Sequence, residues 1–236
     1  MSKTVLVTGS ARGIGKATIL EFAKHGYNVV INYLNSKKAA NSLKNTVENL
    51  YGVRALTIGA DISNEEQVDQ MIKEVINHFG KIDVLVNNAD YYQDNTFLDK
   101  TKEEFMKVLE VNVVGTFLVT KYFSKHISNG VVINVSSLDA TETYNELSMD
   151  YCASKAAVNS LTQTFSLACP NIKFISLMLP WVNTEAIQEM FPEYLESELK
   201  RVGQERLLES SEVASKIYKI IDDKHIKSGT IIKYEF

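Results

Sequence analysis

The sequence predicts a single α/β domain, a doubly wound sheet of seven parallel strands with helices on both faces. Short apolar runs rich in valine and isoleucine alternate along the chain with amphipathic stretches of helical length. Consecutive apolar positions are typical of strands that are buried on both faces, as in a parallel sheet. Regular alternation of such strands with helices is the pattern of βαβ units.

The elements follow one another without interruption. The helical stretch at 64–80 opens with Ser63 or Asn64 as its cap and stops at Gly80. No linker, repeat or low-complexity segment divides the 236 residues, so we expect one domain over 1–236. The expected strands lie at 4–9, 28–33, 54–61, 81–89, 130–137, 172–180 and 229–236, and the most regular helices at 15–26, 37–52 and 64–80.

The composition excludes several classes of protein. The net charge is −4, and the 25 basic residues are scattered along the chain. Nucleic acids and membrane surfaces are therefore not expected as partners, because both require a clustered basic face. No apolar run is long enough to span a membrane, no secretion signal opens the chain, and Cys152 and Cys169 have no metal-ligand spacing. We expect a soluble cytoplasmic protein without a metal site.

A glycine-rich turn, TGSARGIG at residues 8–15, lies between the first strand and the first helix. Gly9, Gly13 and Gly15 allow backbone N–H groups to approach a diphosphate, and the N-terminus of the following helix favours its negative charge. Such a turn alone can be merely tight. The strand before it and the helix after it favour dinucleotide binding.

The glycine spacing, G-x-x-x-G-x-G, resembles that of the short-chain dehydrogenase/reductase family in its compact form. The resemblance continues through ADI, NNA, VNVVG, INVSS, YCASK and LPWVNTEA, over nearly the whole chain. It implies a Rossmann fold, a nicotinamide cofactor, and hydride transfer between that cofactor and a carbonyl or secondary alcohol. The further cofactor contacts that it implies are Ser10, Arg12, Ile14, Asp61, Ile62, Asn88, Ala89, Pro180, Val182 and Thr184.

The end of the second strand indicates which nicotinamide cofactor is preferred. NAD enzymes of this kind usually carry an acidic residue there, which binds the adenosine ribose. No carboxylate occurs at this position, and Arg12 suits a 2′-phosphate because guanidinium matches phosphate geometry. We therefore expect NADP(H) to be favoured, with NAD(H) as the alternative. The candidate contacts in this segment are Asn32, Tyr33, Asn35 and Ser36.

Tyr151 and Lys155 lie one helical turn apart in the segment MDYCASK. A phenol titrates near pH 10, and a neighbouring ammonium group lowers that pKa by favouring the phenolate. Alone, such a pair is most often an ordinary exposed helix face. The resemblance implies instead that Tyr151 donates the proton and that Lys155 lowers its pKa and binds the nicotinamide ribose. It also implies that Ser137 orients the carbonyl oxygen and that Asn112 supports the proton relay.

Four features depart from the family pattern. Asp90 replaces a glycine beside the expected cofactor, and no glycine follows Pro180. The interval between Ser137 and Tyr151 is one residue longer than usual, and the usual D-G-G ending is missing. The first two changes alter the surroundings of the nicotinamide. The longer interval raises the question of whether Ser137 and Tyr151 still reach the same oxygen.

The lengthened loop also bears on the substrate. Its acidic residues would favour neutral or cationic substrates if they face the site, and would otherwise form a solvated loop. The closest resemblance is to 3-oxoacyl-carrier-protein reductases, which dock an acidic partner through arginines. This chain offers Lys125 and Lys173 instead, so that activity is an alternative and not the preferred one. The acidic residues are Asp139, Glu142, Glu146 and Asp150.

Three expectations remain. Residues 185–210 should form a mobile substrate lid, although the spacing of their apolar side chains equally suits a plain amphipathic helix. The resemblance implies a homotetramer or homodimer that assembles through the helices bearing Asn112 and Tyr151. A cofactor-binding sensor or scaffold without turnover is the alternative from another functional class. The lid side chains expected to contact substrate are Met190, Phe191, Tyr194 and Leu195.

Overall fold

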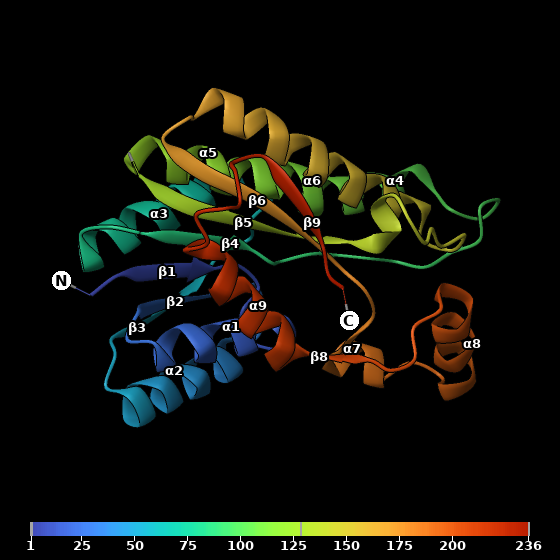
Figure 1. The fold of residues 1–236 in the computed structure, drawn as a ribbon, viewed down its shortest axis with the longest axis horizontal. Coiled ribbons are helices and arrows are strands. Elements are labelled where there is room, and N and C mark those ends of the chain that lie inside the picture. The colour runs from blue at the N-terminus through green and yellow to red at the C-terminus, as the bar shows by residue number, and fades with distance from the viewer. Residues whose placement is uncertain (1, 128, 236) are drawn as a thin grey trace.

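The computed structural model describes residues 2–127 and 129–235 and has the predicted doubly wound α/β architecture (Figure 1). Within these residues, seven strands pair in parallel in the order β3-β2-β1-β4-β5-β6-β9. The strands are β1 (Thr4–Val7), β2 (Asn28–Tyr33), β3 (Ala55–Gly59), β4 (Val84–Asn87), β5 (Gly130–Ser137), β6 (Ile172–Leu179) and β9 (Thr230–Lys233). Most are shorter than expected, because described residues at one or both ends leave the sheet to form loops. Residue 236, the end of the last expected strand, lies outside the described residues.

Helices cover both faces of the sheet, and each face has its own apolar core (Figure 1). In β1, Val5 and Val7 belong to one core and Leu6 to the other, as the alternation of side chains along a strand requires. One layer contains α1 (Gly13–Lys24), α2 (Lys37–Tyr51) and α9 (Ser210–Ile221). The other contains α3 (Glu65–Phe79), α4 (Lys102–Leu109), α5 (Thr116–His126) and α6 (Met149–Ala168).

The ends of α3 show how local sequence sets the bounds of a helix. Of the two candidate caps, Asn64 is the one used, and its side chain accepts a hydrogen bond from the N–H of Gln67 at 3.0 Å. At the other end, Gly80 adopts a left-handed conformation with φ 79°, which glycine tolerates best. In the described part of the chain, no helix is long and apolar enough to cross a membrane.

The topology brings the carboxyl ends of β1, β4, β5 and β6 to one edge of the sheet. The strand order reverses between β1 and β4, and ligands of open α/β sheets bind at such switch points. The remaining elements connect or flank the main helices and strands, and α8 (Pro192–Val202) stands apart from the sheet (Figure 1). The others are the π-helix η1 (Glu110–Gly115), the 3-10 helix η2 (Leu138–Ala140), β7 (Val182–Asn183), α7 (Glu185–Gln188) and β8 (Leu208–Glu209).

Candidate active site

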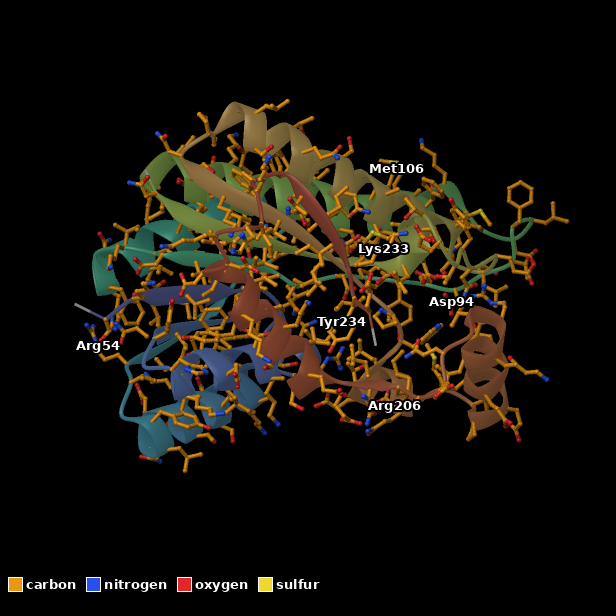
Figure 2. All side chains as sticks on the ribbon, in the orientation of Figure 1. Arg54, Asp94, Met106, Arg206, Lys233 and Tyr234 are labelled. Atoms are coloured by element: carbon orange, nitrogen blue, oxygen red, sulfur yellow. The ribbon has the colours of Figure 1, made fainter. Side chains whose placement is uncertain are left out.

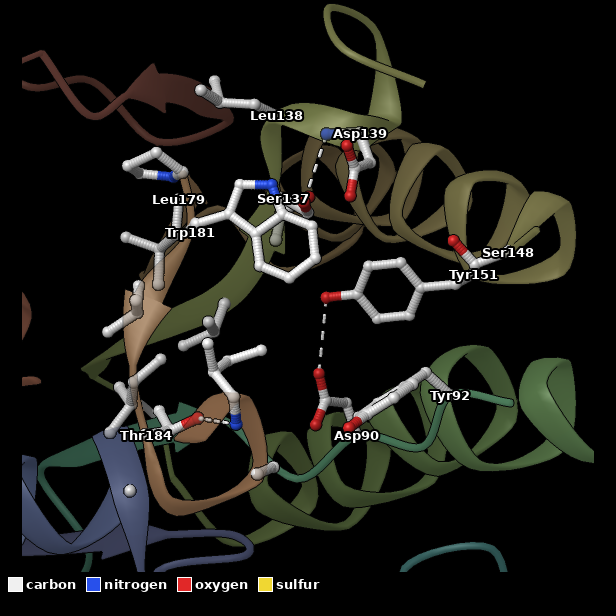
Figure 3. A pocket seen from close by; sticks show the side chains of 18 of the residues that line it. Asp90, Tyr92, Ser137, Leu138, Asp139, Ser148, Tyr151, Leu179, Trp181 and Thr184 are labelled. Atoms are coloured by element: carbon white, nitrogen blue, oxygen red, sulfur yellow. Dashed lines mark hydrogen bonds between the residues drawn. The ribbon is translucent and has the colours of Figure 1, made fainter. Parts of the chain in front are cut away.

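A cavity of about 610 Å³ opens at this edge of the sheet (Figure 3). Its volume lies within the range of small-molecule and cofactor sites. Gly9 follows β1, Asn88 follows β4, Ser137 ends β5 and Pro180 follows β6, and all four residues line the cavity. The predicted glycine turn and the predicted catalytic helix therefore face one space.

The turn contains glycines because a larger side chain at these positions would be strained or would clash with neighbouring atoms. Gly9 and Gly13 have φ of +60° and +55°, in the left-handed region. A Cβ on Gly9 would lie 2.8 Å from the Cα of Ala89, and one on Gly15 would lie 2.7 Å from Nδ2 of Asn88. Ser10 is buried within the turn, where its hydroxyl donates to the carbonyl of Val7 at 2.7 Å.

The N-terminus of α1 holds an anion in this structure. The backbone N–H of Gly13 donates to the carboxylate Oε2 of Glu185, which begins α7, at 3.0 Å. Exposed Arg12 and half-buried Ile14 line the cavity beside it. A backbone cradle that accepts a carboxylate suits a diphosphate, so the residues present fit the dinucleotide that the sequence predicts.

Asn32 supports the glycine turn from below. Its side chain is buried, where Oδ1 accepts from the N–H of Gly9 at 3.1 Å and Nδ2 donates to the carbonyl of Ala60 at 3.1 Å. Tyr33 is half-buried, whereas Asn35 and Ser36 are exposed just before α2. Direct contact of these four residues with a cofactor stays a prediction, and the geometry gives Asn32 a positioning role.

The loop after β4 is fastened to the same turn. The hydroxyl of Thr8 accepts from the N–H groups of Asn88 and Ala89, both at 3.0 Å, and Asn88 Nδ2 donates to the carbonyl of Thr8 at 2.9 Å. Sequence reasoning missed Thr8, whose only signal is its place before Gly9. Asp61 accepts from both the N–H and the hydroxyl of Ser63 in the turn that leads to α3.

Three further predicted cofactor residues lie at separate places in the structure. Ile62 is buried and packs against Gly115, where a Cβ would lie 2.7 Å from the Ile62 side chain. Thr184 lines the cavity and caps α7, since its hydroxyl accepts from the N–H of Ile187 at 3.4 Å. Val182 is buried in β7 and lines the cavity.

Trp181, the one tryptophan of the chain, fills part of the cavity. Its indole lines the same cavity as Ser137 and Tyr151 (Figure 3). Gln204 holds its backbone, because its amide accepts from the Trp181 N–H at 2.9 Å and donates to the carbonyl at 2.7 Å. The missing glycine after Pro180 signalled a change at this place, but not that an aromatic ring would enter the site.

Ser137 ends β5, and Tyr151 and Lys155 lie in the first turns of α6; Figure 3 shows Ser137 and Tyr151 at the cavity. Ser137 and Tyr151 line the same cavity, so the longer loop still brings both residues to one space. Lys155 is buried, donates to the carbonyl of Val135 at 3.1 Å, and lies with Nζ 5.2 Å from the centre of the Tyr151 ring.

Asn112 lies in η1, a π-helical stretch between α4 and α5. Its amide accepts from the N–H of Tyr91 at 2.7 Å and donates to the carbonyl of the same residue at 2.9 Å. It also donates to the hydroxyl of Ser154 at 2.9 Å. Asn112 therefore ties the loop after β4 to α6, and its part in a proton relay stays a prediction.

The pKa of Tyr151 lies well above 10, opposite to the lowering that the resemblance implies. Burial is the largest cause, and the carboxylates of Asp90 and Asp139 add to it. The hydroxyl of Tyr151 donates to Asp90 Oδ2 at 3.5 Å, and Lys155 Nζ lies 3.4 Å from the same oxygen. Asp90 thus offsets the positive charge of Lys155 beside the phenol.

The sequence left open whether the four acids of the loop before Tyr151 face the site, and the structure brings them to different places. Among the described lining residues, only Asp139 comes from this set. Asp150 is buried and pairs with Lys100 at 2.9 Å. Glu142 pairs with Lys233 at 2.6 Å, and Glu146 is exposed.

Other acids line the cavity from the opposite wall. Asp90 and Asp94 lie in the loop after β4, and both line the cavity. Asp94 lies farther out, next to α8 (Figure 2), and burial raises the pKa of its carboxyl. Together with Asp139 they give the substrate end of the cavity an acidic lining.

Helix α8 is tied to the loop that precedes α6. Arg201 donates to the carbonyls of Thr143 and Tyr144 at 2.7 and 2.8 Å and pairs with the buried Glu198 at 2.7 Å. Of the side chains expected to contact substrate, Met190 lines the cavity, whereas Phe191 is exposed. Tyr194 and Leu195 are half-buried on α8.

Comparison with known proteins identifies the family. The family model for short chain dehydrogenases matches residues 3–195. A 3-oxoacyl-(acyl-carrier-protein) reductase of Staphylococcus epidermidis is 30% identical over 229 residues, which cover 95% of this chain and 93% of that protein. A protein of the same description from Synechocystis is 39% identical over 167 residues, 69% of this chain and 66% of that protein.

Solved structures agree with this assignment. A dehydrogenase/reductase from Sinorhizobium meliloti superposes with a TM-score of 0.92 at 26% identity, covering 99% of this chain and 94% of that one. A short chain dehydrogenase from Burkholderia cenocepacia in complex with NADP gives a TM-score of 0.90 at 26% identity, with 99% and 96% covered. The chain belongs to the short-chain dehydrogenase family and is an NAD(P)-dependent enzyme that acts on CH–OH and C=O groups.

Proposed function

We propose that the enzyme interconverts small neutral or cationic ketones and secondary alcohols, with NADP(H) as its preferred cofactor. The observation that carries this proposal is that Ser137 and Tyr151 line the cavity that also contains the glycine turn, with Nζ of Lys155 5.2 Å from the centre of the Tyr151 ring. An acid, a hydrogen-bond donor and a dinucleotide cradle in one cavity meet the needs of carbonyl reduction.

Each side chain has a distinct role in this proposal. When bound, the nicotinamide donates or accepts the hydride. Tyr151 donates its phenolic proton to the oxygen of the ketone, and its high pKa keeps that proton in place at neutral pH. Ser137 donates a hydrogen bond to the same oxygen and orients it. Lys155 stabilises the resulting phenolate by its positive charge and binds the nicotinamide ribose.

The preference for NADP(H) rests on charge at the end of β2. Residues 32–38 contain no carboxylate, and Lys37 and Lys38 are exposed in the first turn of α2. Arg12 is exposed on the cavity wall near the glycine turn. A 2′-phosphate would meet positive charges there, whereas NAD would lack the acidic partner for its ribose. The solved relative in complex with NADP supports the same choice.

The charge of the substrate follows from the lining of the cavity. Asp90, Asp94 and Asp139 repel anions and attract cations, and Trp181 and Tyr92 offer apolar faces. We therefore expect aminoketones and uncharged ketones to be reduced in preference to ketoacids. The segment 185–210, with α7 and α8, is the proposed lid over this end of the single domain 1–236.

The names of the relatives favour a second candidate, a 3-oxoacyl-carrier-protein reductase. The lysines considered for docking the acidic carrier do not support it. Lys173 lies at the start of β6, the edge of the sheet opposite the cavity, and donates to the carbonyl of Asp223 at 2.6 Å. Lys125 lies in the last turn of α5 at that same edge. We therefore prefer a small substrate.

Assembly as a homotetramer or homodimer is a further part of the proposal. Met106, Val114 and Phe117 are 50%, 44% and 43% exposed on the consecutive elements α4, η1 and α5, and Figure 2 shows Met106 on the outside of the molecule. Apolar side chains grouped in this way are typical of interfaces. A monomeric mass by light scattering would contradict this expectation.

The test is a panel of uncharged, amino- and carboxy-ketones with NADPH and NADH, run on the wild type and on Tyr151→Phe. General acid catalysis typically contributes about 10²–10⁴-fold, so turnover by the variant should fall by that factor while NADPH affinity is retained. Full turnover by Tyr151→Phe would refute its role. Binding of cofactor without tyrosine-dependent turnover of any ketone would favour a cofactor-binding sensor. A preference for acyl-carrier thioesters would favour the second candidate, a 3-oxoacyl-carrier-protein reductase.

A further inference from the structure

Asp90 contacts both groups that handle the proton. Its carboxylate oxygen Oδ2 lies 3.5 Å from the hydroxyl of Tyr151 (Figure 3). The same oxygen lies 3.4 Å from Nζ of Lys155. Lys155 is buried, whereas the Asp90 side chain is 38% exposed toward the cavity. The carboxylate therefore lies where substrate, cofactor and proton donor must meet.

The backbone on either side of Asp90 is held in place. On one side, the N–H of Ala89 donates to the hydroxyl of Thr8 at 3.0 Å. On the other side, Asn112 binds both the N–H and the carbonyl of Tyr91, at 2.7 and 2.9 Å. Because both neighbours are anchored to the buried frame, the carboxylate is part of the cavity wall and not a mobile surface group.

The chemistry of the reaction places the nicotinamide near this carboxylate. A hydride can reach the carbonyl carbon only if the ring lies against the carbonyl whose oxygen Tyr151 protonates. The ring carries one positive charge when oxidised and none when reduced, and the rest of the cofactor is the same in both states. A fixed charge in the cavity wall therefore changes the binding energies of the oxidised and reduced cofactor differently, and only through its interaction with the ring.

We propose that Asp90 makes the site select the oxidised nicotinamide cofactor over the reduced one. This inference rests on the proposed cofactor site. Without Asp90, the positive charges of Lys155 and of the oxidised ring would share the cavity and repel each other. The Asp90 carboxylate offsets this repulsion, and it has no charge to attract in the neutral reduced ring. Asp90 is thus a specificity-determining residue for the redox state of the cofactor.

We expect Asp90 to change the ratio of the NADP+ and NADPH dissociation constants about tenfold. The interaction energy of two charges a few ångströms apart in a partly exposed site lies between its small value in water and its larger value near a protein surface. A tenfold change in the ratio of the two dissociation constants corresponds to about 30 mV in the midpoint potential of the bound two-electron couple. The wild type should hold the couple at the more negative potential, since tighter binding of the oxidised form lowers it.

The test is calorimetric titration of NADP+ and NADPH into the wild type, Asp90→Asn and Asp90→Glu at neutral pH. Asp90→Asn removes the charge but keeps the shape, and it should reduce the preference for NADP+ about tenfold. Asp90→Glu keeps the charge and should restore most of the preference. The matched control is Asp94→Asn, which removes a carboxylate from the same cavity and should leave the ratio within about twofold, because among the described contacts it is Asp90, and not Asp94, that meets Tyr151 and Lys155.

The outcomes separate this inference from the proposed function. An unchanged ratio in Asp90→Asn, or an equal change in Asp94→Asn, would overturn the role of Asp90 while leaving the cofactor site intact. Failure of the wild type to bind either cofactor would overturn the proposed function itself. A melting curve for each variant identifies loss of folding, in which case Asp90→Gly, the residue typical of the family at this position, replaces Asp90→Asn in the same titration.

Discussion

The two walls of the active-site cavity are held together by different kinds of interaction. The cofactor wall is built from strand ends, where Thr8, Asn32 and Asn88 bind backbone groups of the adjoining turn. The substrate wall is built from loops and α8, which charged side chains join across long sequence distances: Lys100 pairs with Asp150, and Arg201 donates to the carbonyls of Thr143 and Tyr144. The first wall is a direct extension of the sheet, and the second is added to it.

This difference explains how one fold can retain its cofactor and change its substrate. Backbone contacts at strand ends leave little room for substitution, as the close approach of Gly9 to Ala89 shows. Pairs such as Lys100 with Asp150 depend on two side chains that can be replaced together. Variation in the family can therefore concentrate in the substrate wall without disturbing the sheet.

The largest expected effect breaks the substrate wall. Asp150→Ala leaves Lys100 with only the carbonyl of Gln93 as a hydrogen-bond partner among the described residues, and the Asp150 and Lys100 side chains are 0% and 3% exposed. Loss of one partner of a buried pair typically costs about 3–5 kcal/mol, and the remaining carbonyl contact favours the lower end. The measurement is the free energy of unfolding in urea.

Asp69→Ala is the matched control for this variant. It removes the carboxylate of an exposed aspartate–lysine pair on α3, Asp69 with Lys73, and should cost far less because solvent screens that pair. Equal losses for the two variants would show that the Lys100–Asp150 pair does not hold the substrate wall together.

A smaller effect breaks the cofactor wall. Gly9→Ala places a methyl group 2.8 Å from the Cα of Ala89 at a φ of +60°. The left-handed conformation alone costs about 1–2 kcal/mol for an ordinary residue. Displacement of the loop after β4 should in addition weaken NADPH binding by about tenfold or more, equivalent to about 1.4 kcal/mol.

Gly52→Ala separates the two causes. Gly52 has a similar φ of +66°, but a Cβ there meets nothing within 4 Å. The two variants should therefore lose similar stability through the backbone, while only Gly9→Ala loses NADPH affinity, measured by calorimetry. If Gly52→Ala weakened NADPH binding to the same degree, close packing against Ala89 would not be the reason for a glycine at position 9.

The same contrast decides what the sequence alone could predict. Gly9, Gly13 and Gly15 belong to one turn, and Tyr151 and Lys155 to one helical turn, so local spacing is enough to single them out. The strands could be predicted for the same reason, since each is a continuous apolar run. The confirmed family then follows from the order of these local patterns.

What could not be predicted depends on contacts between distant loops. No periodicity indicates that Asp150 pairs with Lys100, that Asp90 reaches Lys155, or that Trp181 fills the cavity. Burial raises the pKa of Tyr151, and the sequence does not show how deeply the residue is buried. The lower pKa expected from a neighbouring lysine was therefore wrong in direction. Side-chain contacts of this kind are set by loop conformation, which composition constrains only weakly.

The smallest expected effect concerns the contact that joins the two walls, in which Glu185 of α7 occupies the N-terminus of α1. A carboxylate there competes with the cofactor diphosphate for the N–H of Gly13. Charge interactions at a helix terminus are worth about 0.3–1 kcal/mol, so Glu185→Gln should tighten NADPH binding about two- to fivefold.

Exposed Glu193, in the first turn of α8, provides the control Glu193→Gln with the same loss of charge. Because the effect is electrostatic, it should shrink when calorimetry is repeated at high salt. Weaker binding by Glu185→Gln would mean that the carboxylate supports the cofactor site, and the two walls would then be cooperating where we expect them to compete.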